Sequence, residues 1–256
     1  MPIALPSLPP QRLDGRRALI TGAAGGIGIG AATALAAQGA LVTLCGRTAE
    51  KLDDLAEALR DKGWKADTLV ADVTDFDTMK AAIEAADPFD ILVNNAGTNR
   101  PGPFVEATPE NFDLMMGLNV RAAYFTAQSV AKRMIAAGIP GSIINMSSQL
   151  GHVGSADRSL YCATKWAMEG FSKSMAIELA AHGIRVNTLC PTFIETALTR
   201  PYFEDASFKA EVLSRIKLGR IGKVEDLMGP IVFLASDASA LMTGASLMID
   251  GGWTAE

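Results

Sequence analysis

The sequence predicts one α/β domain, built as a doubly wound parallel β-sheet with helices on both of its faces. Short apolar runs alternate along the chain with longer, alanine-rich amphipathic stretches. Such alternation is typical of strands joined by helices, and a helical crossover between parallel strands is right-handed. No linker composition divides the 256 residues, and a chain of this length buries one large core.

The predicted strands are short runs of β-branched and other apolar side chains, as in parallel strands buried on both faces. These runs are residues 18–20, 41–45, 68–71, 91–93, 142–146, 185–189 and 246–249. The predicted helices are the amphipathic stretches between them, at residues 27–38, 50–61, 75–86, 109–137, 159–182 and 224–235. Gly39, Gly63 and Gly183 follow three of these stretches, where a glycine commonly ends a helix.

Two segments do not follow this alternation. Residues 1–13 hold four prolines and are predicted to be an N-terminal extension before the main domain, residues 14–256. They lack the basic start, long apolar run and cleavage site of a signal peptide. Residues 194–222 carry aromatic and charged side chains beyond a strand's carboxyl end, and are predicted to form a mobile cover over the site.

Composition excludes several classes of protein. A net charge of −5 is not the basic footprint of a nucleic-acid binder, and no apolar run is long enough to span a membrane. Cys45, Cys162 and Cys190 are an odd, sparse set, which indicates a reducing compartment, here the cytoplasm, and no disulfide framework. No cysteine–histidine cluster has metal-ligand spacing, so no metal is expected.

A glycine-rich turn follows the first predicted strand and precedes the first predicted helix. It has the pattern T-G-x-x-x-G-x-G, with Gly22, Gly26 and Gly28 in the key places and Ile27 between the last two. Glycines allow close backbone approach to a pyrophosphate, and the helix start offers free N–H groups and a partial positive charge. A plain turn is the alternative, but the strand–turn–helix context favours dinucleotide binding.

In this form the turn resembles that of the classical short-chain dehydrogenase/reductase family, and further motifs continue the resemblance in order to the C-terminus. They are Asn94-Asn95-Ala96-Gly97, Asn119, Ser148, the Y-x-x-x-K pair Tyr161 and Lys165, Pro191 through Thr196, and Asp250-Gly251-Gly252. The resemblance implies a Rossmann-like fold and an NAD(P)-dependent oxidoreductase that interconverts a secondary alcohol and a carbonyl. It also implies a homotetramer.

The pair Tyr161 and Lys165 has a physical rationale for proton transfer. A free tyrosine has a pKa near ~10, too high for a base at neutral pH. Lys165 lies four residues later, on the same helix face, and a charge about 4 Å away at an effective dielectric of ~20 is worth ~4 kcal/mol before desolvation and screening. We therefore expect the lysine to lower the tyrosine pKa, by as much as ~3. A packed tyrosine beside a solvated lysine is the alternative.

The resemblance assigns roles to two further residues. The catalytic serine is Ser148 rather than its neighbour Ser147, and it holds the substrate oxygen near Tyr161. Asn119 is a poor helix former in the middle of a predicted helix; in the family this residue bends the helix and anchors a water chain to the lysine.

The predicted cofactor is NADP, with NAD possible. Gly46 fills the position after the second strand where NAD enzymes carry an acid, and Arg47 follows it; arginine suits the phosphate of NADP. Thr48 can cap the next helix and also reach a phosphate. By resemblance, Asp72 and Val73 bind the adenine. The remaining predicted contacts are Asn95, Ala96 and Gly97, Tyr161 and Lys165, and Pro191, Ile194 and Thr196.

Polar loop residues predict a small hydroxylated substrate such as a sugar, an aldonate or a polyol. The candidate contacts are Arg100, Gln149, His152, Arg158 and Phe193. Apolar lining would be expected for steroids or long acyl chains. Exposed loops are polar in any case, so a reductase of 3-oxoacyl thioesters or other ketones is the alternative.

Two other classes of protein are alternatives to an oxidoreductase. A hydrolase would pair Ser148 with His152 or His182, but the chain has no G-x-S-x-G nucleophile elbow. A non-catalytic, cofactor-binding regulator can share the fold, but this chain keeps all four catalytic candidates. An assay of hydride transfer separates these classes.

Overall fold

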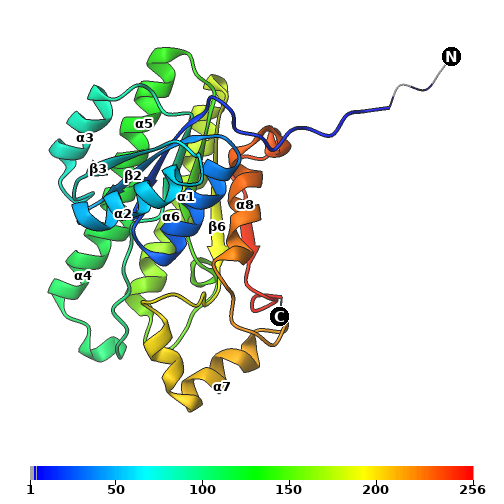
Figure 1. Cartoon of the computed structure of the whole chain (residues 1–256). Coiled ribbons are helices and arrows are strands. Elements are labelled where there is room, and N and C mark those ends of the chain that lie inside the picture. The colour runs from blue at the N-terminus through cyan, green and yellow to red at the C-terminus, as the bar shows by residue number, and fades with distance from the viewer. Residues whose placement is uncertain (1–2, 4, 256) are drawn as a thin grey trace.

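The structure is a computed structural model that describes residue 3 and residues 5–255. Residues 1, 2 and 4 of the predicted N-terminal extension lie outside the described residues. The described part of the extension runs away from the body of the molecule (Figure 1). Its last residue is different: Leu13 is 2% exposed and packs in the core, and its N–H donates to Gln38 O at 2.8 Å. The packed domain therefore begins one residue earlier than predicted.

Seven parallel strands form one sheet in the order β3-β2-β1-β4-β5-β6-β7, which confirms the predicted doubly wound topology. Their bounds are β1 (Arg17–Thr21), β2 (Leu41–Gly46), β3 (Ala66–Val70), β4 (Ile91–Asn94), β5 (Gly141–Met146), β6 (Ile184–Pro191) and β7 (Ser246–Ile249). Strand order reverses between β1 and β4, which lie side by side. In open α/β sheets this switch point is where ligands bind, beyond the carboxyl ends of the strands.

Helices cover both faces of the sheet (Figure 1). The first face packs against α1 (Gly26–Ala37), α2 (Ala49–Arg60) and α8 (Glu225–Ala235). The second packs against α3 (Phe76–Ala85), α5 (Ala123–Ala137) and α6 (Ser159–Leu179). Within the described residues, no helix combines the length and the apolar character needed to span a bilayer.

The strands fill two cores because successive side chains point to opposite faces. Ala18 and Ile20 of β1 belong to the core under α1, whereas Leu19 between them belongs to the core under α5. The prediction that every strand is buried on both faces is wrong at the two edges. Strands β3 and β7 are largely half-buried or exposed, since each has a neighbour on one side only.

Two predicted segments differ from the structure. Residues 109–137 are not one regular helix but α4 (Pro109–Met116), a π-helical segment η2 (Gly117–Ala122) and α5. The predicted cover, for which no helix was predicted, contains the short helix η5 (Arg200–Glu204) and the helix α7 (Ala206–Arg215). Figure 1 shows α7 beyond the main layers, at the end of the sheet toward which β6 points.

Candidate active site

The glycine-rich turn is shaped so that side chains cannot replace its key glycines. Gly22 has φ +64°, and a Cβ there would lie 3.0 Å from Ala96 Cα. A Cβ on Gly28 would overlap Gly22 O and lie 2.8 Å from Ala23 Cα. The turn therefore presses against its own backbone and against the segment after β4, and α1 begins within it at Gly26.

The segment after β4 is bonded to this turn, so it is not a free-standing loop. Asn95 Nδ2 donates to Thr21 O at 3.1 Å and to Gly22 O at 3.0 Å. In return, Thr21 Oγ1 accepts from Asn95 N at 3.0 Å and from Ala96 N at 3.1 Å. These bonds hold together the carboxyl ends of β1 and β4 at the switch point of the sheet.

The segment after β6 reaches the same place. Pro191 ends β6, and Thr192 N still donates to Ile249 O at 3.2 Å, so Thr192 continues the strand pairing. Ile194 is buried and pairs with Gly222. Thr196 lies against the glycine turn, because a Cβ on Gly26 would come within 2.6 Å of Thr196 Cγ2.

An exposed basic side chain, that of Arg47, follows the end of β2. The Arg47 side chain is 77% exposed and lies 4.0 Å from Asp72 Oδ2. Hydrogen bonds from Thr74 lower the pKa of Asp72, which therefore stays ionised beside the arginine, and Val73 packs against the core. The expected cap by Thr48 is not formed: Thr48 occupies the N-cap position of α2, but its side chain makes no cap hydrogen bond.

Tyr161 and Lys165 lie one turn apart on α6, and the lysine ammonium lies over the tyrosine ring. The Lys165 ammonium is 5.5 Å from the centre of the Tyr161 ring. Lys165 is buried and Nζ donates to Met146 O at 2.7 Å, so the carbonyl at the end of β5 fixes its position. Ser148 follows the same strand, and its hydrogen bond to Tyr161 lowers the pKa of the phenol.

The expected direction of the Tyr161 pKa shift is wrong. Burial raises the pKa of Tyr161 to about 12, and the groups that act against burial are Ser148 and the charge of Arg158, not Lys165. Burial also lowers the pKa of Lys165 to about 8, although Cys190 and Glu169 oppose that shift. The loss of solvation on burial therefore changes the pKa of Tyr161 more than the attraction to the Lys165 ammonium does.

Asn119 connects three parts of the site from the π-helical segment. Its Oδ1 accepts from Thr98 N at 2.8 Å, and its Nδ2 donates to Thr98 O at 2.8 Å and to Thr164 Oγ1 at 3.1 Å. Thr164 Oγ1 in turn donates to Tyr161 O at 2.8 Å. The helix is irregular at this asparagine, as expected, and a Cβ on Gly97 would lie 3.2 Å from Asn119 Oδ1.

Comparisons with known proteins agree with this geometry. Residues 22–254 match a family model described as enoyl-(acyl carrier protein) reductase. The chain is 43% identical to D-erythrulose reductase of Gallus gallus, covering 96% of this chain and 98% of that one. It is 41% identical to gluconate 5-dehydrogenase of Gluconobacter oxydans (strain 621H), covering 94% and 96%.

A crystal structure of gluconate 5-dehydrogenase from Burkholderia cenocepacia J2315, in complex with NADP and tartrate, superposes with a TM-score of 0.93. Its sequence identity is 40%, covering 97% of this chain and 99% of that chain. The chain belongs to the classical short-chain dehydrogenase/reductase family. It is an NAD(P)-dependent oxidoreductase that acts on CH–OH groups and their carbonyl counterparts.

In this dehydrogenase/reductase, the candidate substrate residues divide into two groups. Gln149 and Arg158 lie close to two of the catalytic candidates: Gln149 Oε1 accepts from Ser148 Oγ at 2.8 Å, and the charge of Arg158 acts on Tyr161. Arg100 lines a shallow groove with Asp157 and Ser159. The loop that carries Arg100 reaches this groove through Gly102 N, which donates to Asp157 O at 3.0 Å.

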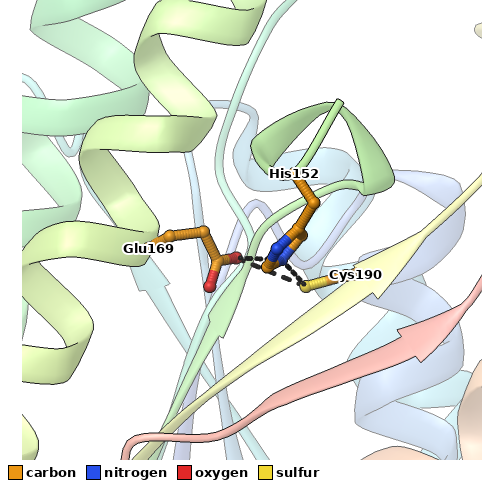
Figure 2. A group of neighbouring side chains, drawn as sticks. All are labelled: His152, Glu169 and Cys190. Atoms are coloured by element: carbon orange, nitrogen blue, oxygen red, sulfur yellow. Dashed lines mark hydrogen bonds and ion pairs between the residues drawn. The ribbon is translucent and has the colours of Figure 1, made fainter. Parts of the chain in front are cut away.

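Phe193 and His152 face other neighbours. Phe193 belongs to an aromatic cluster with Phe203, Phe208 and Trp253, at ring-centre distances of 6.0, 5.7 and 5.8 Å. The Phe193 ring therefore joins the cover to the C-terminal segment. His152 Nε2 faces Glu169 and Cys190 (Figure 2). Ser148 Oγ bonds instead to Gln149 and Leu150 N, so the pairing that a hydrolase would need is not formed.

Glu169 and Thr164 are site neighbours that sequence reasoning missed. Thr164 is buried beside Asn119, and Glu169 is a carboxylate 5% exposed on the buried face of α6. Spacing gives a signal for Glu169, since it stands one turn beyond Lys165 on the same face. An acid so deeply buried is rare without partners.

Proposed function

We propose that this chain is an NADP(H)-preferring oxidoreductase of small polyhydroxylated carbonyls and alcohols, such as ketoses, polyols or sugar acids. Two similar relatives are named for D-erythrulose and for gluconate. The similar gluconate 5-dehydrogenase structure is in complex with NADP and with tartrate. Tartrate is itself a small hydroxylated acid, so all three comparisons favour the same chemical class.

The amide of Gln149 carries the substrate-class proposal. It is buried directly beside Ser148, and its Oε1 already accepts from the Ser148 hydroxyl. Its Nε2 is a hydrogen-bond donor beside the same hydroxyl, and a hydroxyl or carbonyl oxygen of a substrate would accept from it. An apolar ketone offers fewer acceptors beyond the reacting carbonyl, and so would gain less from this amide.

The proton-transfer roles follow from the protonation states of the catalytic pair. Because the pKa of Tyr161 is raised to about 12, its hydroxyl is protonated at neutral pH and can donate to a carbonyl oxygen during reduction. Ser148 holds that oxygen by a hydrogen bond. The Lys165 ammonium, 5.5 Å from the ring centre, stabilises the tyrosinate that forms. In the oxidative direction, the same tyrosinate takes the proton from the alcohol.

Asn119 acts indirectly in this proposal. It holds Thr98 in the loop after β4 and Thr164 on α6, and so it sets the distance between the turn at Asn95–Gly97 and the catalytic helix. We also propose that Asn119 anchors a water chain that brings protons to Lys165.

The residues of the switch point fit NADP. The turn from Gly22 to Gly28 is closed to side chains and meets the start of α1, as pyrophosphate binding requires. The exposed Arg47 would hold the additional phosphate together with the Thr48 hydroxyl, which makes no cap hydrogen bond to α2. Asp72, Val73 and residues 95–97 would hold the adenosine, and Pro191, Ile194 and Thr196 the nicotinamide. A bound reduced nicotinamide supplies the hydride.

Two substrate contacts belong to this proposal besides Gln149. Arg158 and Arg100 would hold a substrate carboxylate or hydroxyls, as guanidinium groups do in bidentate pairs. Phe193 would bound the pocket on the side of the cover. His152 has a different set of neighbours and is considered below.

The proposal includes assembly and location. Several large apolar side chains are exposed on α4, α5 and α6: Phe112, Leu114, Tyr124, Ile135, Trp166 and Ile177. Large exposed apolar surface is typical of an interface, which supports a homotetramer in which these helices and the C-terminal region around residues 247–253 pair by two-fold symmetry. A monomer in light scattering at micromolar concentration would contradict it. The three free cysteines support a cytoplasmic location.

A substrate panel tests the proposed function. NADPH and NADH oxidation are measured with a ketose, a keto-sugar acid, a simple apolar ketone and a 3-oxoacyl thioester. We expect the highest kcat/KM with the hydroxylated substrates and NADPH, and a selective loss of that preference in Gln149→Leu. A clear preference for the apolar ketone or the thioester, unaffected by Gln149→Leu, would overturn the substrate class and leave the oxidoreductase assignment in place.

A further inference from the structure

A cluster of three potential metal ligands lies beside the catalytic helix. His152 comes from the loop after the short helix η3 (Gln149–Gly151), Glu169 from α6 and Cys190 from β6. The three side chains point toward one another from three separate elements (Figure 2). His152 and Glu169 are 17 positions apart along the chain, and Glu169 and Cys190 are 21 positions apart. The sequence therefore has no short cysteine–histidine motif that predicts the cluster.

The distances between the three ligand atoms match the edges of a metal-centred tetrahedron. Cys190 Sγ lies 3.5 Å from His152 Nε2 and 3.3 Å from Glu169 Oε1, and the same nitrogen and oxygen are 3.4 Å apart. Zinc bonds of ≈ 2.3 Å to sulfur and ≈ 2.0–2.1 Å to nitrogen or oxygen give tetrahedral edges of about 3.3–3.6 Å. The ligand atoms therefore need almost no movement to share one ion.

Neighbouring hydroxyls fix the carboxylate for single-oxygen coordination. Glu169 Oε2 accepts from Thr188 Oγ1 at 2.9 Å and from Ser246 Oγ at 2.6 Å. That leaves Oε1 facing His152 and Cys190. Burial favours the neutral acid, but neighbouring hydroxyl groups outweigh it and lower the pKa of Glu169. Outer hydrogen bonds of this kind are typical of ligating carboxylates.

A fourth position and an entry path are also present. Ser147 Oγ is buried and has no hydrogen-bond partner among the described residues. It is placed to bond a fourth ligand such as water. Burial raises the pKa of the Cys190 thiol to about 12, so the thiol keeps its proton until an ion binds. The His152 side chain is 31% exposed, whereas that of Glu169 is 7% exposed, so an ion would enter past the imidazole.

We propose that His152, Glu169 and Cys190 form a binding site for a zinc-type divalent ion, with water as the fourth ligand. Imidazole, carboxylate and thiolate are all ligands that zinc prefers. On binding, the Cys190 thiol releases its proton to solvent, and sulfur, Nε2 of His152 and Oε1 of Glu169 each bond the ion. No oxidation or reduction takes place. Without the ion, the thiol donates to Glu169 Oε1 and the group is a hydrogen-bonded triad.

Cobalt(II) serves as the spectroscopic probe. The purified full chain, free of any histidine tag and stripped of metal by dialysis against chelator, is titrated with Co²⁺. We expect one ion bound per chain, with the visible absorption of a tetrahedral site and a thiolate-to-cobalt charge-transfer band. Added Zn²⁺ should displace the probe and remove both signals. The measurement needs no turnover, so its outcome is independent of the proposed function.

Matched variants distinguish this site from adventitious binding. Cys190→Ala should abolish the charge-transfer band, and His152→Ala, which alters a partly exposed loop residue, should abolish stoichiometric binding without a cavity in the core. Cys162→Ala is the control, since this half-buried thiol on α6 lies outside the cluster, and it should bind like wild type. Ser246→Ala, which removes an outer hydrogen bond, should weaken binding about 10- to 100-fold.

Two results would overturn the site. One is the absence of stoichiometric Co²⁺ binding by the wild-type chain, which would leave His152, Glu169 and Cys190 as a hydrogen-bonded triad only. The other is a spectrum that persists in both Cys190→Ala and His152→Ala while those variants keep the wild-type unfolding temperature, which would place the ion elsewhere.

Discussion

The two sides of the active-site edge are built in different ways. Around β1 and β4, the surface is made by glycines and by backbone groups that bond the short side chains of Thr21 and Asn95, and the segments that meet there follow neighbouring strands. Around β5 and β6, the surface depends on larger side chains from distant positions. Phe193 packs on Trp253, and Lys165 Nζ donates to Met146 O.

This difference separates a general function from a specific one. The backbone surface suits the phosphates and sugars of a cofactor that many enzymes share, and glycine spacing alone prescribes it. The side-chain surface has to fit one substrate, so single substitutions there can change its shape. We therefore expect substitutions on the cofactor side to affect binding and stability, and those on the catalytic side to affect turnover.

The largest effect is expected for Tyr161→Phe. Loss of the hydroxyl removes the proton donor, and kcat should fall by at least about 10²–10⁴-fold, the usual range for general acid–base catalysis. NADPH binding, followed by fluorescence, should stay near wild type, because the aromatic ring remains. Tyr124→Phe, on an exposed tyrosine of α5, is the control. If Tyr161→Phe retains appreciable turnover, another group donates the proton.

A pair of glycine variants tests the cofactor side. The Cβ of Gly28→Ala would overlap backbone at Gly22 O, whereas the nearest atom to the Cβ of Gly25→Ala is 3.4 Å away. We expect Gly28→Ala to lose about 1–3 kcal/mol of unfolding free energy and most NADPH affinity, and Gly25→Ala to keep its stability. Equal losses in both variants, in denaturant titrations, would contradict a role for backbone shape.

Lys165→Met tests the cost of burying the catalytic ammonium. The pKa of Lys165 is lowered to about 8 from 10.5 by burial, so the unfolded chain binds more protons between these values and stability rises with pH there. Below pH 8 the burial cost is complete. At 1.36 kcal/mol per pH unit, the unfolding free energy of wild type relative to Lys165→Met should rise by about 3 kcal/mol from pH 7.5 to 10.5.

The control for that measurement is Lys51→Met, on an exposed lysine of α2, which corrects for the loss of a lysine side chain. A difference between wild type and Lys165→Met that stays constant across the range would mean that the ammonium is not desolvated. Turnover of Lys165→Met should be lost at every pH, since the tyrosinate no longer has its cation.

The smallest expected effect is that of Arg47→Ala on cofactor choice. Removal of a charge-assisted contact costs on the order of 2 kcal/mol, so Kd for NADPH should rise about 30-fold while Kd for NADH changes little. Lys62→Ala, beyond the other end of α2, controls for the loss of one surface charge. An unchanged preference, measured by competition of the two cofactors, would show that Arg47 does not contact the phosphate.

Sequence reasoning succeeded where structure follows from local rules. The doubly wound parallel sheet and its two helical layers follow from periodicity, because the alternation of strands and helices depends on neighbours along the chain. Gly39, Gly63 and Gly183 have φ of +100°, +78° and +68°, as helix-ending glycines should.

Sequence reasoning failed where contacts between residues far apart in the chain decide the local structure. The π-helical segment around Asn119 is held by Thr98 and Thr164, which no helical periodicity encodes. Helix α7 lies outside the strand–helix alternation, so that alternation does not predict it. The pKa of Tyr161 rises because burial outweighs the lysine, and burial is not a property of the Y-x-x-x-K spacing. The contacts of His152 with Glu169 and Cys190 could not be predicted, because these residues are remote in sequence.

The contact between Thr196 and Gly26 has a kinetic consequence. The segment that leads into α7 rests on the glycine turn, so the start of the cover is positioned by the surface proposed to bind the cofactor. A substrate arriving first would meet a site that lacks the nicotinamide. We therefore expect ordered addition, with cofactor first and last off. Product inhibition by NADP should accordingly be competitive with NADPH and noncompetitive with the carbonyl substrate.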